Sequence, residues 1–89
     1  MAEIEIYTSP FCGYCYRAKA LLEGKGVAYR EIDVVFHPAK RKEMVDRAVG
    51  ARTVPQVFID GLHVGGSDEL AALEAAGHLD RLLDRNDDS

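Results

Sequence analysis

The sequence predicts an α/β fold: a four-stranded mixed sheet with helices on both faces, in the order β-α-β-α-β-β-α. Apolar and polar residues alternate at the start of the chain, and apolar residues recur later at helical spacing. In addition, Asp60-Gly61 separates two short apolar runs, the strongest short-range signal for a β-hairpin. Eighty-nine residues suffice for one small domain, which we expect at 1–85, followed by a polar C-terminal tail at 86–89.

The first half of the chain indicates a strand, a helix and a second strand. Ile4 and Ile6 alternate with polar side chains, which is typical of a strand. Proline within the segment 8–11 ends that strand, and a helix is expected from about Gly13 to Glu23, where glycines follow. β-branched and aromatic residues predict the second strand at 27–34.

A second helix is expected from Pro38 to about Val49. Proline suits the first turn of a helix because its missing N–H would have no helical partner there. Gly50 then provides a stop signal. The apolar side chains of this helix that we expect to face the core are Met44, Val45, Ala48 and Val49.

The rest of the chain predicts a hairpin and two helices. Strands at 57–59 and 62–64 flank the Asp-Gly turn. Ser67 is expected to cap a helix that runs to about Ala76, with acidic residues in its first turn, and a short leucine-containing helix follows Gly77. The first two strands, joined through a helix, should be parallel with a right-handed crossover, so the sheet is mixed.

Composition and charge narrow the possible partners. The longest apolar stretches span about four residues, against roughly 20 for a spanning helix, so no membrane partner is expected. The first residues show no secretory signal, which predicts a cytoplasmic protein. The formal net charge of −4 argues against a nucleic-acid partner.

The charge is unevenly distributed along the chain. Residues 1–66 hold nine basic and eight acidic side chains, whereas residues 67–89 hold two and seven. The basic residues of the first part could attract a small anion or could form solvated helix faces. They include Arg17, Lys19, Lys40, Arg41, Lys42, Arg47 and Arg52.

The two cysteines of the chain stand close together, in Cys12-Gly13-Tyr14-Cys15. A disulfide closing so short a loop stabilises a fold weakly, by about 2 kcal/mol, and the cytosol keeps structural disulfides reduced. Two small core residues or a zinc site are the alternatives. One cysteine pair supplies only two zinc ligands, and no histidine lies at a recognisable zinc-finger spacing. The spacing therefore favours redox chemistry.

The predicted helix gives the two cysteines different roles. Cys12 lies where a loop becomes a helix, so unpaired backbone N–H groups and the helix dipole favour its thiolate form. Cys15 lies one turn further along, on the buried face, and should remain a thiol until it is needed. We therefore expect Cys12 to attack and Cys15 to resolve. A Cys-x-x-Cys pair after the first strand of such a sheet is the thioredoxin-like arrangement.

Several segments together resemble the glutaredoxin family, of the short bacterial dithiol type, over roughly residues 3–83. Besides the cysteine motif they are Ile6-Tyr7-Thr8, Arg17-Ala18-Lys19-Ala20-Leu21-Leu22, Thr53-Val54-Pro55-Gln56-Val57-Phe58-Ile59-Asp60-Gly61 and Gly65-Gly66-Ser67-Asp68. The resemblance implies a glutathione-dependent thiol–disulfide oxidoreductase. Such an enzyme reduces protein disulfides and glutathione mixed disulfides, with glutathione as co-substrate.

The resemblance also implies a glutathione site. Pro55 would be a cis proline facing the cysteines, although an ordinary trans proline beginning a strand is the alternative; the Val54 backbone would then pair with glutathione's peptide. The start of the helix at Ser67 and Asp68 suits the carboxylate and ammonium of the γ-glutamyl group. Tyr14 would line the groove or be a half-exposed helix residue. The implied binding residues are Tyr14, Arg52, Thr53, Val54, Pro55, Gly66, Ser67 and Asp68.

Two positions depart from the family's pattern. Many relatives carry a lysine where this chain has Ser9, and Arg52 is a candidate substitute for that cation at the glycyl carboxylate. Gly13 stands where the commonest dithiol relatives have proline. In the family, such a glycine also occurs in members that assemble a [2Fe–2S] cluster. The alternative function is therefore a cluster-binding homodimer in which each chain supplies Cys12 and one glutathione; otherwise a monomer is expected.

Overall fold

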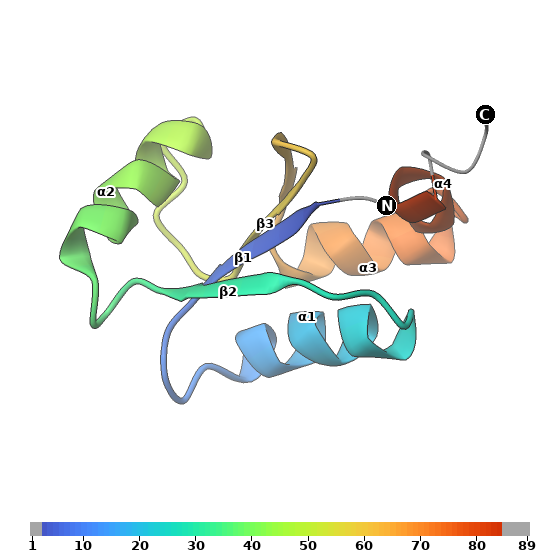
Figure 1. Cartoon of the computed structure of the whole chain (residues 1–89), viewed down its shortest axis with the longest axis horizontal. Coiled ribbons are helices and arrows are strands. Elements are labelled where there is room, and N and C mark those ends of the chain that lie inside the picture. The colour runs from blue at the N-terminus through green and yellow to red at the C-terminus, as the bar shows by residue number, and fades with distance from the viewer. Residues whose placement is uncertain (1–2, 85–89) are drawn as a thin grey trace.

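The computed structural model describes residues 3–84 and shows a central sheet between two layers of helices (Figure 1). The elements follow one another as β1 (Ile4–Thr8), α1 (Gly13–Gly24), β2 (Arg30–Asp33), α2 (Pro38–Arg47), β3 (Gln56–Ile59), β4 (Leu62–Gly65), α3 (Ser67–Ala75) and α4 (Leu79–Asp84). The predicted thioredoxin-like α/β fold is confirmed, with α4 as the expected short last helix. The predicted boundary between residues 1–85 and the tail at 86–89 lies outside the described residues.

The four strands form one mixed sheet in the order β2-β1-β3-β4. β1 and β2 are parallel, while β3 runs antiparallel to both β1 and β4. Helix α2 covers one face, and α1 and α3 lie on the other (Figure 1). Within residues 3–84, none of the helices is long and apolar enough to cross a membrane.

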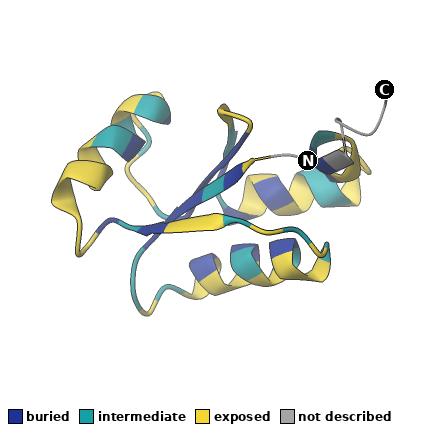
Figure 2. Ribbon diagram, in the orientation of Figure 1, coloured by how far each residue is buried: buried dark blue, intermediate teal, exposed yellow. Residues whose placement is uncertain are grey.

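Each face of the sheet has its own hydrophobic core. The larger core lies between one face of the central strands and helices α1, α3 and α4. Its buried members are Ile4, Ile6, Ala18, Leu22, Val57, Ile59, Leu70, Leu79 and Leu83. The smaller core lies under α2 and consists of Tyr7, Ile32, Val34, Met44, Ala48 and Phe58. Because both faces are covered, every residue of β3 is buried, and the buried side chains follow the sheet and the inner helix faces (Figure 2).

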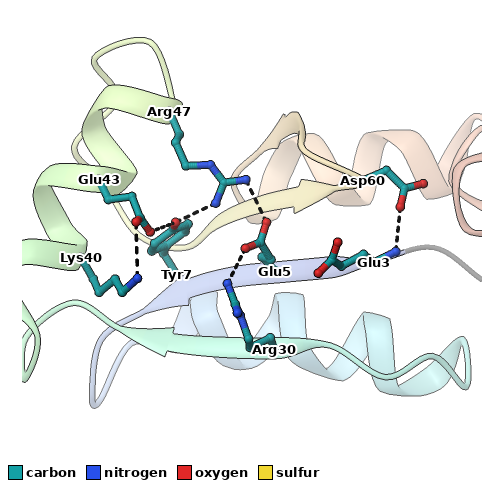
Figure 3. A network of polar contacts seen from close by, with 8 residues as sticks. All are labelled: Glu3, Glu5, Tyr7, Arg30, Lys40, Glu43, Arg47 and Asp60. Atoms are coloured by element: carbon teal, nitrogen blue, oxygen red, sulfur yellow. Dashed lines mark hydrogen bonds and ion pairs between the residues drawn. The ribbon is translucent and has the colours of Figure 1, made fainter.

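A polar network, drawn in Figure 3, fastens α2 to the sheet. The Arg47 guanidinium bonds Glu5 Oε1 and the Tyr7 hydroxyl, both at 2.8 Å, and it lies 4.1 Å from the centre of the Phe58 ring. The Tyr7 hydroxyl in turn donates to Glu43 Oε1 at 2.6 Å. The hydrogen bond from Arg47 is the main reason that the pKa of the Glu5 carboxyl lies below its usual value. Side chains of β1 and α2 that would otherwise be costly to bury therefore satisfy one another.

The hairpin turn has the geometry that its sequence predicts. Asp60 and Gly61 both have positive φ, at 53° and 81°, as a tight two-residue turn of this kind requires. The Asp60 carboxylate also accepts the backbone N–H of Glu3 at 2.8 Å (Figure 3). In addition, Asp60 N–H donates to the Glu3 carbonyl at 2.7 Å. The turn therefore fixes the beginning of β1 as well as joining β3 to β4.

Two predicted elements are shorter in the structure. β2 begins at Arg30 rather than Val27, because its parallel partner pairs with it only over Glu5–Thr8. The second helix ends at Arg47, and the prediction that Val49 faces the core is wrong, since its side chain is 89% exposed. The chain reverses there through positive φ at Val49 (55°) and Gly50 (90°), which turns the valine outward.

Val49 is a position where substitution should stabilise the fold. A β-branched residue at positive φ is strained, whereas asparagine tolerates this region. Val49→Asn loses little packing because the side chain is exposed, so we expect a gain of about 1 kcal/mol, or roughly 4–8 °C in the midpoint of thermal unfolding. Val35→Asn, also at an exposed valine but without positive φ, is the control and should give no gain. An unchanged or lower midpoint for Val49→Asn would contradict the strain.

Candidate active site

Cys12 lies between β1 and α1 and is the N-cap residue of that helix. Its backbone is extended, and its Sγ accepts the backbone N–H of Cys15 at 3.2 Å. A sulfur here occupies the position usually taken by a serine or aspartate oxygen, facing the unpaired N–H groups of the first turn. The predicted location of Cys12 at the head of the helix is confirmed, and the contact stabilises negative charge on its sulfur.

Cys15 lies one turn further along α1 and faces the core, with 2% of its surface exposed. Burial, followed by the hydrogen bond to Cys12, raises the pKa of the Cys15 thiol to about 12. Both cysteines are free thiols. Two sulfurs of the same residue type therefore have different surroundings, one partly exposed at a helix start and one buried and protonated.

The segment before β3 approaches the cysteines from the other side. The Val54–Pro55 peptide bond is cis, as the motif predicted. The carbonyl oxygen of Val54 lies 3.9 Å from Cys12 Sγ, within reach of a weak S–H donor. The residue before the proline and the helix-capping sulfur are therefore neighbours, although 42 positions separate them in the sequence.

A groove of about 410 Å³ runs beside this contact. It is lined by side chains and backbone from α1, from the cis-proline segment and from the start of α3: Tyr14, Thr53, Val54, Pro55, Gly66, Ser67, Asp68 and Glu69. Tyr14 is 59% exposed and the Arg17 guanidinium lies over its ring, 5.9 Å from the centroid. The fold thus brings together all of the predicted binding residues except Arg52.

Arg52 instead lines a separate hollow with residues of α2. Its carbonyl oxygen accepts a hydrogen bond from Arg41 at 3.0 Å, which ties this part of the loop to α2. Thr53, the next residue, lines the groove, whereas Arg52 does not.

The start of α3 differs by one residue from the prediction and adds a residue to the groove. Gly66, not Ser67, is the N-cap, and its backbone N–H donates to Glu69 Oε1 at 2.7 Å. A side chain at Gly65 could not be accommodated, because its Cβ would lie 2.8 Å from Glu69 Cγ at a φ of +119°. A Cβ on Gly66 would lie 3.2 Å from the Pro55 carbonyl oxygen. Gly66 therefore lets the helix start and the cis-proline segment meet, while Gly65 leaves room for Glu69.

Electrostatics give the groove two different ends. Near Cys12 it offers the backbone of Val54. At the start of α3 it offers the N–H groups of the first helical turn, which favour an anion, beside the carboxylate of Asp68, which favours a cation. Within residues 3–84, no group of three or more histidine, cysteine or acidic side chains is placed to hold a metal ion.

The site combines a cysteine that caps a helix, a second cysteine buried one turn further along, and a cis proline that faces them. On this sheet, that combination defines a thiol–disulfide oxidoreductase of the thioredoxin-like class. Comparison with known proteins gives the family. The glutaredoxin family model matches residues 4–64. Glutaredoxin 3 of Escherichia coli K12 is 55% identical over 83 residues, which cover 93% of this chain and 99% of that protein.

Solved structures agree with the sequence comparison. The solution structure of glutaredoxin from Brucella melitensis is 53% identical, with a TM-score of 0.81 over 93% of this chain and 89% of that one. The crystal structure of a buckwheat glutaredoxin–glutathione complex is 31% identical, with a TM-score of 0.86 over 94% and 78%. The chain belongs to the glutaredoxin family and is a thiol–disulfide oxidoreductase. The family resemblance of its motifs is confirmed.

Proposed function

We propose that this enzyme uses glutathione to reduce glutathione mixed disulfides and protein disulfides, with Cys12 as nucleophile and Cys15 as resolving thiol. The observation that supports this most strongly is the groove that ends at the Val54 carbonyl, 3.9 Å from Cys12 Sγ. Its lining offers groups complementary to the γ-glutamyl end and to the peptide backbone of an extended γ-glutamyl tripeptide. The buckwheat relative, whose structure is a complex with glutathione, makes glutathione the natural candidate.

Glutathione would lie along the groove with its sulfur toward Cys12. Its cysteine residue would pair with the backbone of Val54, like a strand added to an edge. The γ-glutamyl carboxylate would accept N–H groups of Ser67 and Asp68, and the Asp68 carboxylate would bind the ammonium. Tyr14 would form a side wall. Arg52, which adjoins the groove residues in sequence but lines a separate hollow, would attract the glycyl carboxylate, an exposed charge interaction worth about 1 kcal/mol or less.

Removal of glutathione from a protein needs one sulfur of the enzyme. The Cys12 thiolate attacks the glutathionyl sulfur, forms a Cys12–glutathione disulfide and releases the protein thiolate, which takes a proton. The thiolate of a second glutathione then attacks the bound glutathionyl sulfur. Oxidised glutathione leaves, and Cys12 returns as a thiolate. One free glutathione thiol is consumed: its sulfur and the glutathionyl sulfur from the substrate form the disulfide of oxidised glutathione, and the protein sulfur becomes a thiol.

Reduction of a protein disulfide also needs Cys15. Cys12 first attacks one sulfur of the substrate, which makes a mixed disulfide and frees one substrate thiol. The hydrogen bond and the charge of Cys12, which help to raise the pKa of Cys15, disappear once Cys12 is in that disulfide. Cys15 then loses its proton more easily and attacks Cys12 Sγ, which releases the second substrate thiol. Two glutathiones reduce the Cys12–Cys15 disulfide and leave as oxidised glutathione.

A second candidate function is binding of a [2Fe–2S] cluster. The partly exposed sulfur of Cys12 and the open space at Gly13, where a Cβ would meet no atom within 4 Å, favour access by a cluster. One chain offers only that sulfur, so four ligands would require two chains and two glutathione thiolates. Protein purified without oxygen in the presence of glutathione should then be a coloured dimer with visible absorbance; a colourless monomer would contradict this function.

Asp68 provides the test of the glutathione groove. Asp68→Ala should raise the KM for glutathione mixed disulfides roughly 10-fold, because one charge-assisted contact of about 1.5 kcal/mol is lost. Asp80→Ala removes an exposed carboxylate of α4 that does not line the groove, and it serves as the control with unchanged KM. Steady-state kinetics of the two variants make the comparison, and an unchanged KM for Asp68→Ala would remove Asp68 from the site.

The two cysteines can be separated by serine substitution. Cys15→Ser should keep most activity toward glutathione mixed disulfides but lose two-thiol reduction of protein disulfides. Cys12→Ser should abolish both activities, since no nucleophile remains. Both variants are assayed with a glutathionylated peptide and with a protein disulfide. Substantial activity of Cys12→Ser in either assay would show that Cys12 is not the nucleophile.

A further inference from the structure

A hydrogen-bonded chain of three side chains links the outer strand β4 to the segment that faces Cys12. His63 Nε2 lies 2.6 Å from Gln56 Oε1. The Gln56 amide nitrogen donates to the Thr53 carbonyl at 3.0 Å and lies 3.3 Å from Thr53 Oγ1. Neither His63 nor Gln56 lines the groove or takes part in the chemistry described above.

The direction of these hydrogen bonds fixes the state of each group. The Gln56 nitrogen is occupied by Thr53, so the amide oxygen is the atom that faces His63. An amide oxygen only accepts, and Nε2 of His63 must therefore carry a hydrogen. This holds for the neutral ring with hydrogen on Nε2 and for the imidazolium, so either form supports the chain.

At one end of this series of hydrogen bonds, His63 packs against the smaller core. The His63 ring lies against Phe58, with 5.0 Å between the ring centroids, and Phe58 is itself held between Tyr7 and Arg47. Gln56 is 3% exposed and is the first residue of β3. A buried amide that loses a partner is destabilised, so the structure favours the arrangement in which both ends of Gln56 are bonded.

At the other end of this series of hydrogen bonds, Thr53 lines the groove. Thr53 and Val54 are adjacent wall residues, and the Val54 carbonyl lies 3.9 Å from Cys12 Sγ. We infer that His63 and Gln56 are positioning residues, which hold the backbone at Thr53–Val54 in the place where it binds the peptide part of glutathione. This inference rests on the proposed function and adds to it a control of glutathione affinity from the outer strand.

Replacement of His63 by phenylalanine tests the inference. His63→Phe keeps a ring against Phe58 but removes the donor to Gln56. The KM for a glutathionylated peptide should rise about 3- to 10-fold, the effect of losing one hydrogen bond, while kcat stays within about twofold. His63→Gln, whose amide nitrogen can take the place of Nε2, should restore a KM close to that of the parent.

Gln56→Met tests the same chain from its centre, independently of whether the phenylalanine variant folds. It keeps the length of the side chain, breaks both links, and should raise KM by a similar factor. The double variant should be no worse than Gln56→Met alone, since both changes break one chain; additive effects would contradict the inference.

Thermal unfolding and the Asp68 variant separate the possible failures. A lower unfolding midpoint for His63→Phe with unchanged KM would mean that His63 is only structural, which overturns the inference. If Asp68→Ala raises KM but neither His63→Phe nor Gln56→Met does, the groove is correct and the positioning role is wrong. If none of the three changes KM, the proposed function itself fails.

Discussion

The hydrogen bond from the Cys15 backbone N–H to Cys12 Sγ, at 3.2 Å, is the interaction on which the active site depends. It places the Cys12 sulfur over the first turn of α1, where helix donors favour negative charge. Its geometry requires that α1 begin at Gly13, directly after the loop that leaves β1. Ala18 and Leu22, buried on the same face as Cys15, hold α1 against the sheet and so fix that starting point.

The same packing separates the properties of the two sulfurs. Since helix residues three or four positions apart share a face, Cys15, Ala18 and Leu22 form one buried stripe of α1, which begins one turn after the cap at Cys12. Burial then keeps Cys15 protonated while Cys12 stays accessible. The groove adds binding to this asymmetry, because Gly66 allows the start of α3 to meet the cis-proline segment. One helix start thus supports the reactive sulfur and another supports the proposed glutathione site.

Much of this arrangement follows from local sequence signals. Period-two alternation in β1, the Asp-Gly turn and the glycine stops predict the elements, and the cysteine spacing predicts which sulfur is buried. The failures have physical reasons. Val49 continues an apolar helical pattern, but the helix has already ended and positive φ turns the side chain outward. Ser67 has the residue type of a cap, yet Gly66 caps the helix with Glu69. The glutamate three residues after Gly66 is the sequence signal that indicates a cap at Gly66.

Long-range polar contacts were beyond prediction from the sequence. Nothing in the local pattern of Arg47 indicates that its guanidinium joins Glu5 and Tyr7 across the sheet. In the same way, the contact between His63 and Gln56 depends on the register of β3 and β4, which includes an irregularity between Val57 and Phe58. Arg52 directly precedes the groove residue Thr53 in the sequence, yet it lines a separate hollow with residues of α2, and its carbonyl accepts a hydrogen bond from Arg41.

The central claim is that the Cys12 sulfur is partly exposed at the head of a helix while the Cys15 sulfur is buried and protonated. Brief alkylation of the reduced protein with iodoacetamide at neutral pH, followed by peptide mass spectrometry, tests it most directly. The account predicts rapid modification of Cys12 and almost none of Cys15, whose pKa of about 12 and 2% exposure protect it. Modification of Cys15 as fast as that of Cys12, in protein that remains folded, would contradict the account.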